Sequence, residues 1–196
     1  MKVAFIIYEG MTALDFVGVY DPLTRLKTMG LMPELEYDVC ATIRDVRDHA
    51  GLRIGADRVC VPLDAYDMVI VPGGFASRTL VDDADFVGWL RGAAPCPYKV
   101  SVCSGALLLG AAGFLLGKRA ATHNNAKQAL AAYGARAVDD RVVDDGDVIT
   151  ATGVTSAIDL GLYLVEKLGG ADARAKIQSQ MEYDRCTATL GGLAER

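Results

Sequence analysis

The chain has 196 residues, of which 52% are hydrophobic and 23% charged, and its formal net charge is −5. This length and composition suit a globular protein with one sizeable core, so we predict a single domain over residues 1–196. The acidic charge argues against nucleic-acid binding and a polybasic membrane anchor, and the apolar run of residues 3–8 is too short for a signal-peptide core or a membrane span.

The first half of the chain alternates between apolar runs and helical patterns. The patterns predict buried strands over residues 2–8, 35–42 and 66–71, a pair of short strands within residues 44–61, a sharp turn at residues 72–75, and a surface helix over residues 82–94. The first helix should begin near Thr12 or Asp15, either of which can cap it, and end near Met29. Pro22 lies inside this helix, so we expect a kink or a later start.

The second half repeats this alternation. It predicts a strand over residues 99–102, an extended piece at residues 120–123, helices over residues 106–112, 125–133, 157–168 and 171–183, and a loose tail. Residues 137–149 are typical of two short strands that turn at Asp145-Gly146. Strands that alternate with helices predict an α/β sandwich with a mostly parallel sheet.

Several polar or glycine residues lie just past the ends of predicted strands. They are Asp15, Gly73-Gly74, Cys103 and Thr152-Gly153. Ligands of parallel sheets bind outside the carboxyl ends of the strands. We therefore expect these residues to converge on one edge of the sheet and to form a site for a small-molecule substrate.

Cys103 has the sequence context of a reactive cysteine. The strand before it becomes the helix after it within two residues, as in the nucleophile elbow of hydrolases, and Gly105 lets the helix start close to the sheet. A thiol at a helix N-terminus meets free N–H groups and the positive end of the helix dipole, which predicts a lowered thiol pKa. The alternative is a small buried core residue, as most free cysteines are.

The other cysteines are interpreted as structural. The chain has five cysteines, Cys40, Cys60, Cys96, Cys103 and Cys186, without a Cys-x-x-Cys motif, and only two histidines. This odd and scattered set predicts neither a zinc site nor a disulfide framework, and it fits a reducing cytoplasm. We expect a cytoplasmic protein with no metal and no organic cofactor.

Asp15 is the candidate acid beside Cys103. A carboxyl and a thiol that share an apolar site titrate as a coupled pair, so Asp15 can donate a proton to a substrate while the thiolate attacks. The alternative is that Asp15 only caps its helix. Gly74 and Ser104 can each offer a backbone N–H to developing negative charge, and Gly73 lets a substrate approach the backbone closely.

His123 is the imidazole that we expect near the site, because His49 lies in the early strand region. A structural hydrogen bond to the backbone is at least an equal alternative for His123. Thr152, Gly153 and Thr155 are candidates for the pocket lining, although residues of this kind also cap helices.

Three segments together resemble the DJ-1/PfpI superfamily over nearly the whole chain. They are the Val-Pro-Gly-Gly turn of residues 71–74, the elbow of residues 101–106, and residues 109–123, which end in His123. Within the superfamily the chain is most similar to isonitrile hydratases and to the sensor domains of AraC-type regulators, through residues 14–18 and 152–159.

This resemblance implies a flavodoxin-like fold, a homodimer, a Cys103 nucleophile and Asp15 as the acid beside it. PfpI-type proteases and related glyoxalases carry histidine directly after the cysteine. Here that position is Ser104, which counts against peptidase or amidase chemistry. Two further positions depart from the hydratase pattern, because Asn124 stands where an aromatic residue is usual and residues 184–187 replace a proline-rich segment.

The resemblance favours a cysteine-dependent hydratase that converts isonitriles to N-substituted formamides through a thioimidate on Cys103. Two alternatives stay open. One is a glyoxalase- or deglycase-like enzyme that acts on small dicarbonyls, and the other is a non-enzymatic thiol redox or ligand sensor in which Cys103 is oxidised. A DNA-binding regulator is not expected, because the residues after Tyr183 leave no room for a helix-turn-helix.

Overall fold

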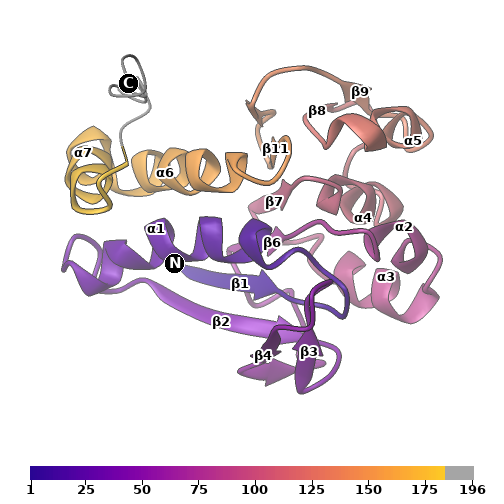
Figure 1. Cartoon of the computed structure of the whole chain (residues 1–196), viewed down its shortest axis with the longest axis horizontal. Helices are drawn as coiled ribbons and strands as arrows, with labels where there is room; N and C mark the ends of the chain where they lie inside the picture. The colour runs from indigo at the N-terminus through magenta and orange to yellow at the C-terminus, as the bar shows by residue number, and fades with distance from the viewer. Residues whose placement is uncertain (184–196) are drawn as a thin grey trace, which may run out of the picture.

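A seven-stranded sheet forms the centre of the molecule in the computed structural model, which describes residues 1–183 (Figure 1). In spatial order its strands are β10 (Val142–Asp144), β11 (Val148–Ala151), β7 (Tyr98–Val102), β6 (Met68–Val71), β1 (Lys2–Ile6), β2 (Glu36–Ala41) and β5 (Arg58–Val59). Neighbouring strands are parallel, except that β10 runs antiparallel to β11. The predicted mostly parallel sheet and the hairpin at Asp145-Gly146 are both confirmed. The predicted tail lies outside the described residues.

Two groups of helices flank this sheet (Figure 1). The first group consists of α1 (Ala13–Thr28), α6 (Ser156–Gly169) and α7 (Ala171–Gln180), and the second of α2 (Ser77–Leu80), α3 (Ala84–Arg91) and α4 (Gly105–Ala111). The chain leaves β1 toward one edge of the sheet and β6 toward the other, so right-handed crossovers put the two groups on opposite faces. The α/β sandwich is thereby confirmed. Helix α2 was not predicted, because four residues are too few to show a helical period.

Two small units lie outside the main sheet. A hairpin pairs β3 (Asp45–Arg47) with β4 (Arg53–Gly55), and a second small unit contains β8 (Arg119–Ala120), the 3₁₀ turn η1 (Asn124–Ala126), α5 (Lys127–Ala131) and β9 (Arg136–Ala137). The predicted pair of short strands within residues 44–61 is therefore confirmed, with β5 as an additional strand that joins the main sheet. No helix within residues 1–183 has the length and apolar character to cross a membrane.

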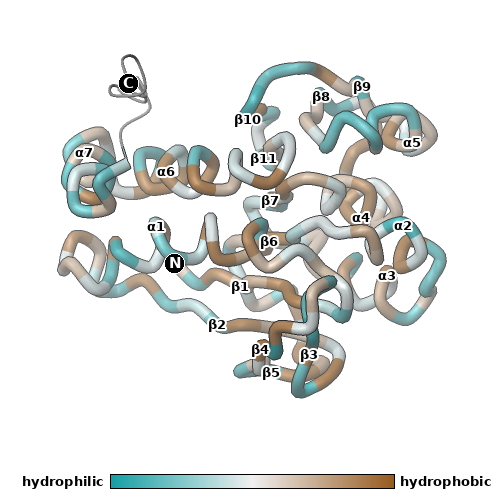
Figure 2. Tube along the Cα trace, viewed as in Figure 1, coloured by the Kyte–Doolittle hydropathy of each residue, from teal (hydrophilic) through white to brown (hydrophobic). Residues whose placement is uncertain are grey.

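The apolar run at the start of the chain becomes the central strand of the core. Residues 3–7 are at most 1% exposed, because β1 is paired on both edges and covered on both faces. Figure 2 shows much of this run in brown and β2 changing from teal to brown along its length, whereas α7 and α5 carry much of the teal. Burial on both faces explains why the run lacks the polar–apolar alternation of a half-exposed strand.

Helix α1 runs through Pro22 without interruption, so the predicted later start is wrong. Proline removes the hydrogen bond to the carbonyl of Gly18, one turn earlier. Both residues lie against α6, where a side chain on Gly161 would come within 2.4 Å of the Pro22 ring and 3.1 Å of the Gly18 carbonyl oxygen. Close packing of α1 against α6 therefore compensates for the missing bond.

The reversal of chain direction between β1 and β6 creates a crevice at the carboxyl ends of the strands. The loops after β1, β6 and β7 all open at this edge, and Cys103 is the first residue after β7. The topology thus directs Cys103 to the position in the sheet where ligands are expected.

Candidate active site

Cys103 occupies a sharp bend between β7 and α4, as predicted. Its φ is +58°, a left-handed conformation that is uncommon for a residue with a side chain. Hydrogen bonds hold the bend in place. The Cys103 N–H donates to the carbonyl oxygens of Ala151 (3.0 Å) and Thr152 (2.8 Å), and the Thr122 hydroxyl donates to the Cys103 carbonyl (2.8 Å). A strained residue that its neighbours hold so firmly is a feature of functional sites.

Glycines let the loop after β6 press against this bend. A Cβ on Gly73 would lie 2.6 Å from the Ser104 nitrogen and 2.8 Å from the Cys103 Cβ. A Cβ on Gly105 would lie 2.4 Å from the Val71 carbonyl oxygen. Neither position has room for a side chain, so the close contact between the loop after β6 and the Cys103 bend requires glycine at both positions.

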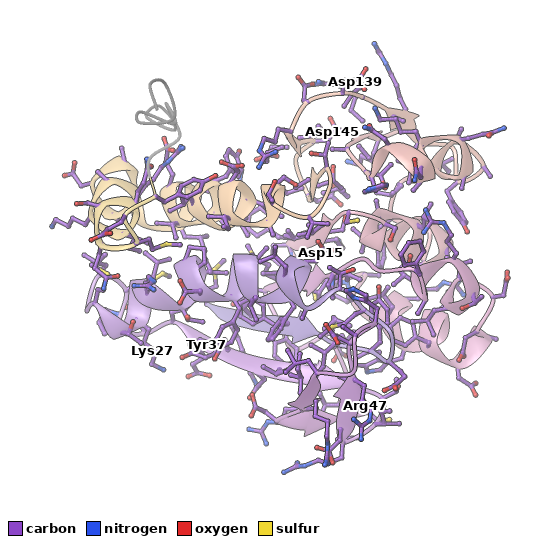
Figure 3. The ribbon with its side chains drawn as sticks, viewed as in Figure 1. Asp15, Lys27, Tyr37, Arg47, Asp139 and Asp145 are labelled. Atoms are coloured by element: carbon purple, nitrogen blue, oxygen red, sulfur yellow. The ribbon has the colours of Figure 1, made fainter. Side chains whose placement is uncertain are left out.

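Asp15 lies fully buried in the first turn of α1 and faces the loop after β6 (Figure 3). Its Oδ2 accepts the Gly73 N–H (3.0 Å), and its Oδ1 is buried without a hydrogen-bond partner among residues 1–183. The N-cap of α1 is Thr12, and no side chain caps the helix. The alternative that Asp15 only caps its helix is therefore wrong. A buried carboxyl oxygen without a partner is costly, and it is suited to hold a proton or contact a ligand.

Burial raises the pKa of Asp15 from 3.8 to about 7. The Gly73 N–H, the neighbouring Cys103 thiol and the charge of His49 oppose this rise, each with a smaller effect. Near neutral pH the carboxyl group can therefore take up or release a proton. That is the range in which a general acid or base works best.

The Cys103 thiol is 6% exposed, and its pKa is raised to about 12, opposite to the direction predicted from the sequence. Burial is the largest cause, and the neighbouring Asp15 charge adds to it. Hydrogen bonds from the backbone and side chain of Ser104 lower the pKa but do not outweigh burial. Helix α4 has seven residues, so its end is a weaker source of positive potential than the expectation assumed. The resting thiol is protonated, and Asp15 is the group beside it that can accept the proton.

Of the two predicted N–H donors, Gly74 and Ser104, only the Ser104 N–H points toward the reacting sulfur. The Gly74 N–H donates to the Ser104 hydroxyl oxygen (3.0 Å), whereas the Ser104 N–H faces the Cys103 sulfur and lowers its pKa. The Ser77 hydroxyl lies 2.8 Å from the Ser104 hydroxyl and 2.7 Å from the Gly74 carbonyl oxygen. Ser77 thus completes a buried network that holds Ser104, and the sequence carried no signal for it because α2 was not foreseen.

The remaining candidates for the pocket lining differ in where they lie relative to the cavity beside Cys103. His123 lines the same cavity as Cys103, and its Nδ1 accepts the Asn125 N–H (3.2 Å), so the ring has the structural hydrogen bond offered as an alternative. Gly153 lies under this ring, where a Cβ would be 3.0 Å from the imidazole Cδ2. Thr152 contributes its carbonyl to the Cys103 bend. Thr155 is exposed and its hydroxyl accepts a hydrogen bond from Arg141 (3.1 Å), away from the cavity.

Two residues that the sequence analysis did not propose for the site, His49 and Tyr8, lie near Cys103 and Asp15. The expectation that His49 is remote is wrong, because the β3–β4 hairpin folds back and the His49 charge influences Asp15. The His49 N–H donates to the Met11 carbonyl (2.9 Å), which fixes the hairpin to the loop before α1. Tyr8 is buried and donates its hydroxyl hydrogen to the Pro72 carbonyl (2.9 Å). The Tyr8 hydrogen bond holds the loop after β6, in which Gly73 contacts Asp15.

A cavity of about 100 Å³ opens above the sulfur. Its walls include Thr12, Phe75, Arg78, Cys103, His123 and Val154. The cavity has room for a few waters or a compact organic group next to the thiol. Residues 1–183 contain no group of three or more His, Cys, Asp or Glu side chains placed to hold a metal ion.

Comparisons with known proteins agree with this architecture. The model of the DJ-1/PfpI family matches residues 1–167. Isonitrile hydratase from Pseudomonas putida is 35% identical over 185 residues, which cover 93% of this chain and 78% of that protein. The crystal structure of a THiJ/PfpI family protein from Pseudomonas syringae has a TM-score of 0.85 and 33% identity, over 97% of this chain and 78% of that one.

Schizosaccharomyces pombe DJ-1 shares the fold at 21% identity, with a TM-score of 0.79 over 94% of this chain and all of that one. The sandwich described above is thus the flavodoxin-like fold of these proteins. The matched residues include α1 and the segments after β6 and β7, which carry Asp15, Gly73 and Cys103. This chain belongs to the DJ-1/PfpI family.

Proposed function

We propose that the protein is a cysteine-dependent hydratase that converts isonitriles to N-substituted formamides, with Cys103 as nucleophile and Asp15 as proton carrier. The observation that carries this proposal is the buried, coupled pair of thiol and carboxyl groups. An isonitrile accepts both a nucleophile and a proton at the same terminal carbon atom. A thiol and an acid side by side can therefore supply both groups that the hydration uses, and the name of the Pseudomonas putida relative supports this substrate class.

In the first step, the Asp15 carboxylate takes the proton from the Cys103 thiol as the sulfur attacks the terminal carbon. One carbon–sulfur bond forms, and Asp15 then delivers the same proton to that carbon. The product is a thioimidate in which Cys103 is joined to a CH=N group. The raised pKa of Asp15, about 7, suits a group that must first accept and then release a proton.

In the second step, water adds to the thioimidate carbon. One proton of the water passes to the substrate nitrogen and the other returns to the thiol, while the carbon–sulfur bond breaks. The products are an N-substituted formamide and the original pair. Covalent catalysis divides the hydration into two easier steps, and neither step needs a redox change.

The test is hydration of cyclohexyl isonitrile, followed as formamide production by mass spectrometry. We expect Cys103→Ala to abolish turnover and Asp15→Asn to lower kcat by about 100-fold or more, the range of a general acid–base contribution. Cys60→Ala is the matched control, because Cys60 is an exposed free thiol outside the cavity. Full activity in Cys103→Ala would exclude the proposed mechanism.

The two alternatives have less support. A redox sensor works best with an exposed thiolate, whereas Cys103 is buried and its pKa is raised. A glyoxalase-like enzyme would use the same thiol on an aldehyde, with Asp15 as base. Turnover of methylglyoxal without turnover of isonitriles would favour that second candidate over the hydratase.

A further inference from the structure

A cationic side chain lines the cavity, and no carboxylate balances it. Arg78 follows the loop after β6 in α2 and lines the same cavity as Cys103. Within residues 1–183 it takes part in none of the ion pairs. Among residues 1–183, six of the ten other arginines pair with acids, as Arg141 does with Asp159. Arg78 is therefore an available cation at a site where a ligand is expected.

The surroundings of Arg78 favour an anion further. The guanidinium carbon lies 5.7 Å from the centre of the Phe75 ring, whose side chain is 78% exposed. The other polar side chains of the cavity wall are the hydroxyls of Thr12 and Ser104, the His123 imidazole and the Asn125 amide. No aspartate or glutamate lines the cavity within the described part of the chain, and Asp15, the carboxyl beside Cys103, is fully buried and forms no part of the cavity wall.

The isonitrile group itself gives the protein little to recognise. It carries no net charge and it is a weak hydrogen-bond acceptor, so selectivity must come from the rest of the substrate. A guanidinium matches a carboxylate with two parallel hydrogen bonds, which are among the strongest polar contacts in proteins. The cavity of about 100 Å³ limits the distance between the two recognised groups to a short linker.

We propose that Arg78 is a specificity-determining residue that selects small isonitriles carrying a carboxylate close to the isonitrile group. This inference rests on the proposed hydratase function and names its substrate class. Arg78 is exposed, so water and salt weaken the pairing, and we expect a preference of roughly tenfold rather than several thousandfold.

The experiment compares isocyanoacetate with isocyanoacetamide, which have nearly the same shape but differ in charge. The quantity measured is the ratio of their kcat/KM values. We expect a ratio of about ten in the natural protein, near one in Arg78→Met, and an intermediate value in Arg78→Lys, which keeps the charge but not the fork. The ratio should also fall as the salt concentration rises from 0.05 to 0.5 M. Arg136→Met removes an exposed charge outside the cavity and serves as the matched control.

A ratio near one in the natural protein, or a ratio that survives in Arg78→Met, would overturn the inference while leaving hydration intact. If neither compound nor cyclohexyl isonitrile is hydrated, the proposed function fails instead. In that case the preference for an anion is tested without turnover, by comparing the calorimetric binding affinities of N-formylglycine and N-formylglycinamide for the natural protein. Tighter binding of the carboxylate that is lost in Arg78→Met supports the role of Arg78, and equal binding of both overturns it.

Discussion

Replacing Asp15 with asparagine should stabilise the folded protein at alkaline pH while it destroys the proton carrier. Asparagine keeps the size of the side chain and an oxygen that can accept the Gly73 N–H. It removes the buried negative charge that Asp15 carries above its pKa. The substitution therefore tests separately how much the buried Asp15 charge lowers the free energy of unfolding and how much Asp15 contributes to catalysis.

The magnitude follows from the difference between the folded and unfolded pKa. The pKa of Asp15 is raised from 3.8 to about 7, a difference of about 3 units, and each unit corresponds to about 1.36 kcal/mol. An acid with a raised folded pKa releases its proton more easily when unfolded. The natural protein thus loses stability as the pH rises from about 4 to about 7, by about 4 kcal/mol in total. Asparagine does not titrate, so the variant escapes this loss.

The assay is urea unfolding at pH 5 and pH 8, with the natural protein and Asp15→Asn side by side. The variant's advantage in free energy of unfolding should grow by about 2 to 3 kcal/mol between the two pH values. Asp64→Asn, at an exposed carboxyl outside the cavity, should show no such growth. An advantage for Asp15→Asn that is the same at pH 5 and pH 8 would refute the raised pKa and, with it, the account of the proton carrier.

Two further outcomes are expected. The rate of isonitrile hydration should rise as the pH increases through about 7, because only the ionised Asp15 can accept the thiol proton. The residual activity of Asp15→Asn should not show this rise. A rate that falls over the same pH range would contradict the proposed proton transfer from Cys103 to Asp15. Gly105→Ala should lower the free energy of unfolding by about 2 kcal/mol or more, because its Cβ would lie 2.4 Å from the Val71 carbonyl oxygen. Gly88→Ala, where a Cβ meets nothing within 4 Å, is its control in thermal unfolding, and equal effects of the two would argue against the tight bend.

The fold was predictable because its signals are local and repeated. Continuous apolar runs marked β1 and β6 as buried strands, and their alternation with helices indicated the parallel sheet. The bend at Cys103 was predictable for the same reason, since strand, cysteine and helix follow one another without a linker. Asp15 joined the site through the general rule that strand carboxyl ends meet at one edge.

The missing parts of the site depend on contacts between distant segments. His49 was placed far from the pair, because its position depends on how the β3–β4 hairpin folds back. Ser77 and Arg78 belong to a helix of four residues, which is too short to show a period. The pKa of Cys103 was predicted in the wrong direction because its sign depends on burial, and burial depends on packing that local patterns do not describe.

The β3–β4 hairpin has a consequence for the shape of the cavity wall. Figure 3 shows Arg47 on this hairpin. The Arg47 carbonyl accepts the Gly10 N–H (2.7 Å) and the Arg47 N–H donates to the Glu9 carboxylate (2.8 Å), so the hairpin braces the loop that leads to Thr12 in the cavity wall. Yet the hairpin makes no ladder with the main sheet. Val46 anchors the hairpin in the core, whereas Arg47 and Arg53 are exposed, so changes at the exposed positions would shift the loop before Thr12 and leave the core contacts in place. We therefore expect the exposed positions of this hairpin to tune the shape of the cavity wall at Thr12 without moving Cys103 itself.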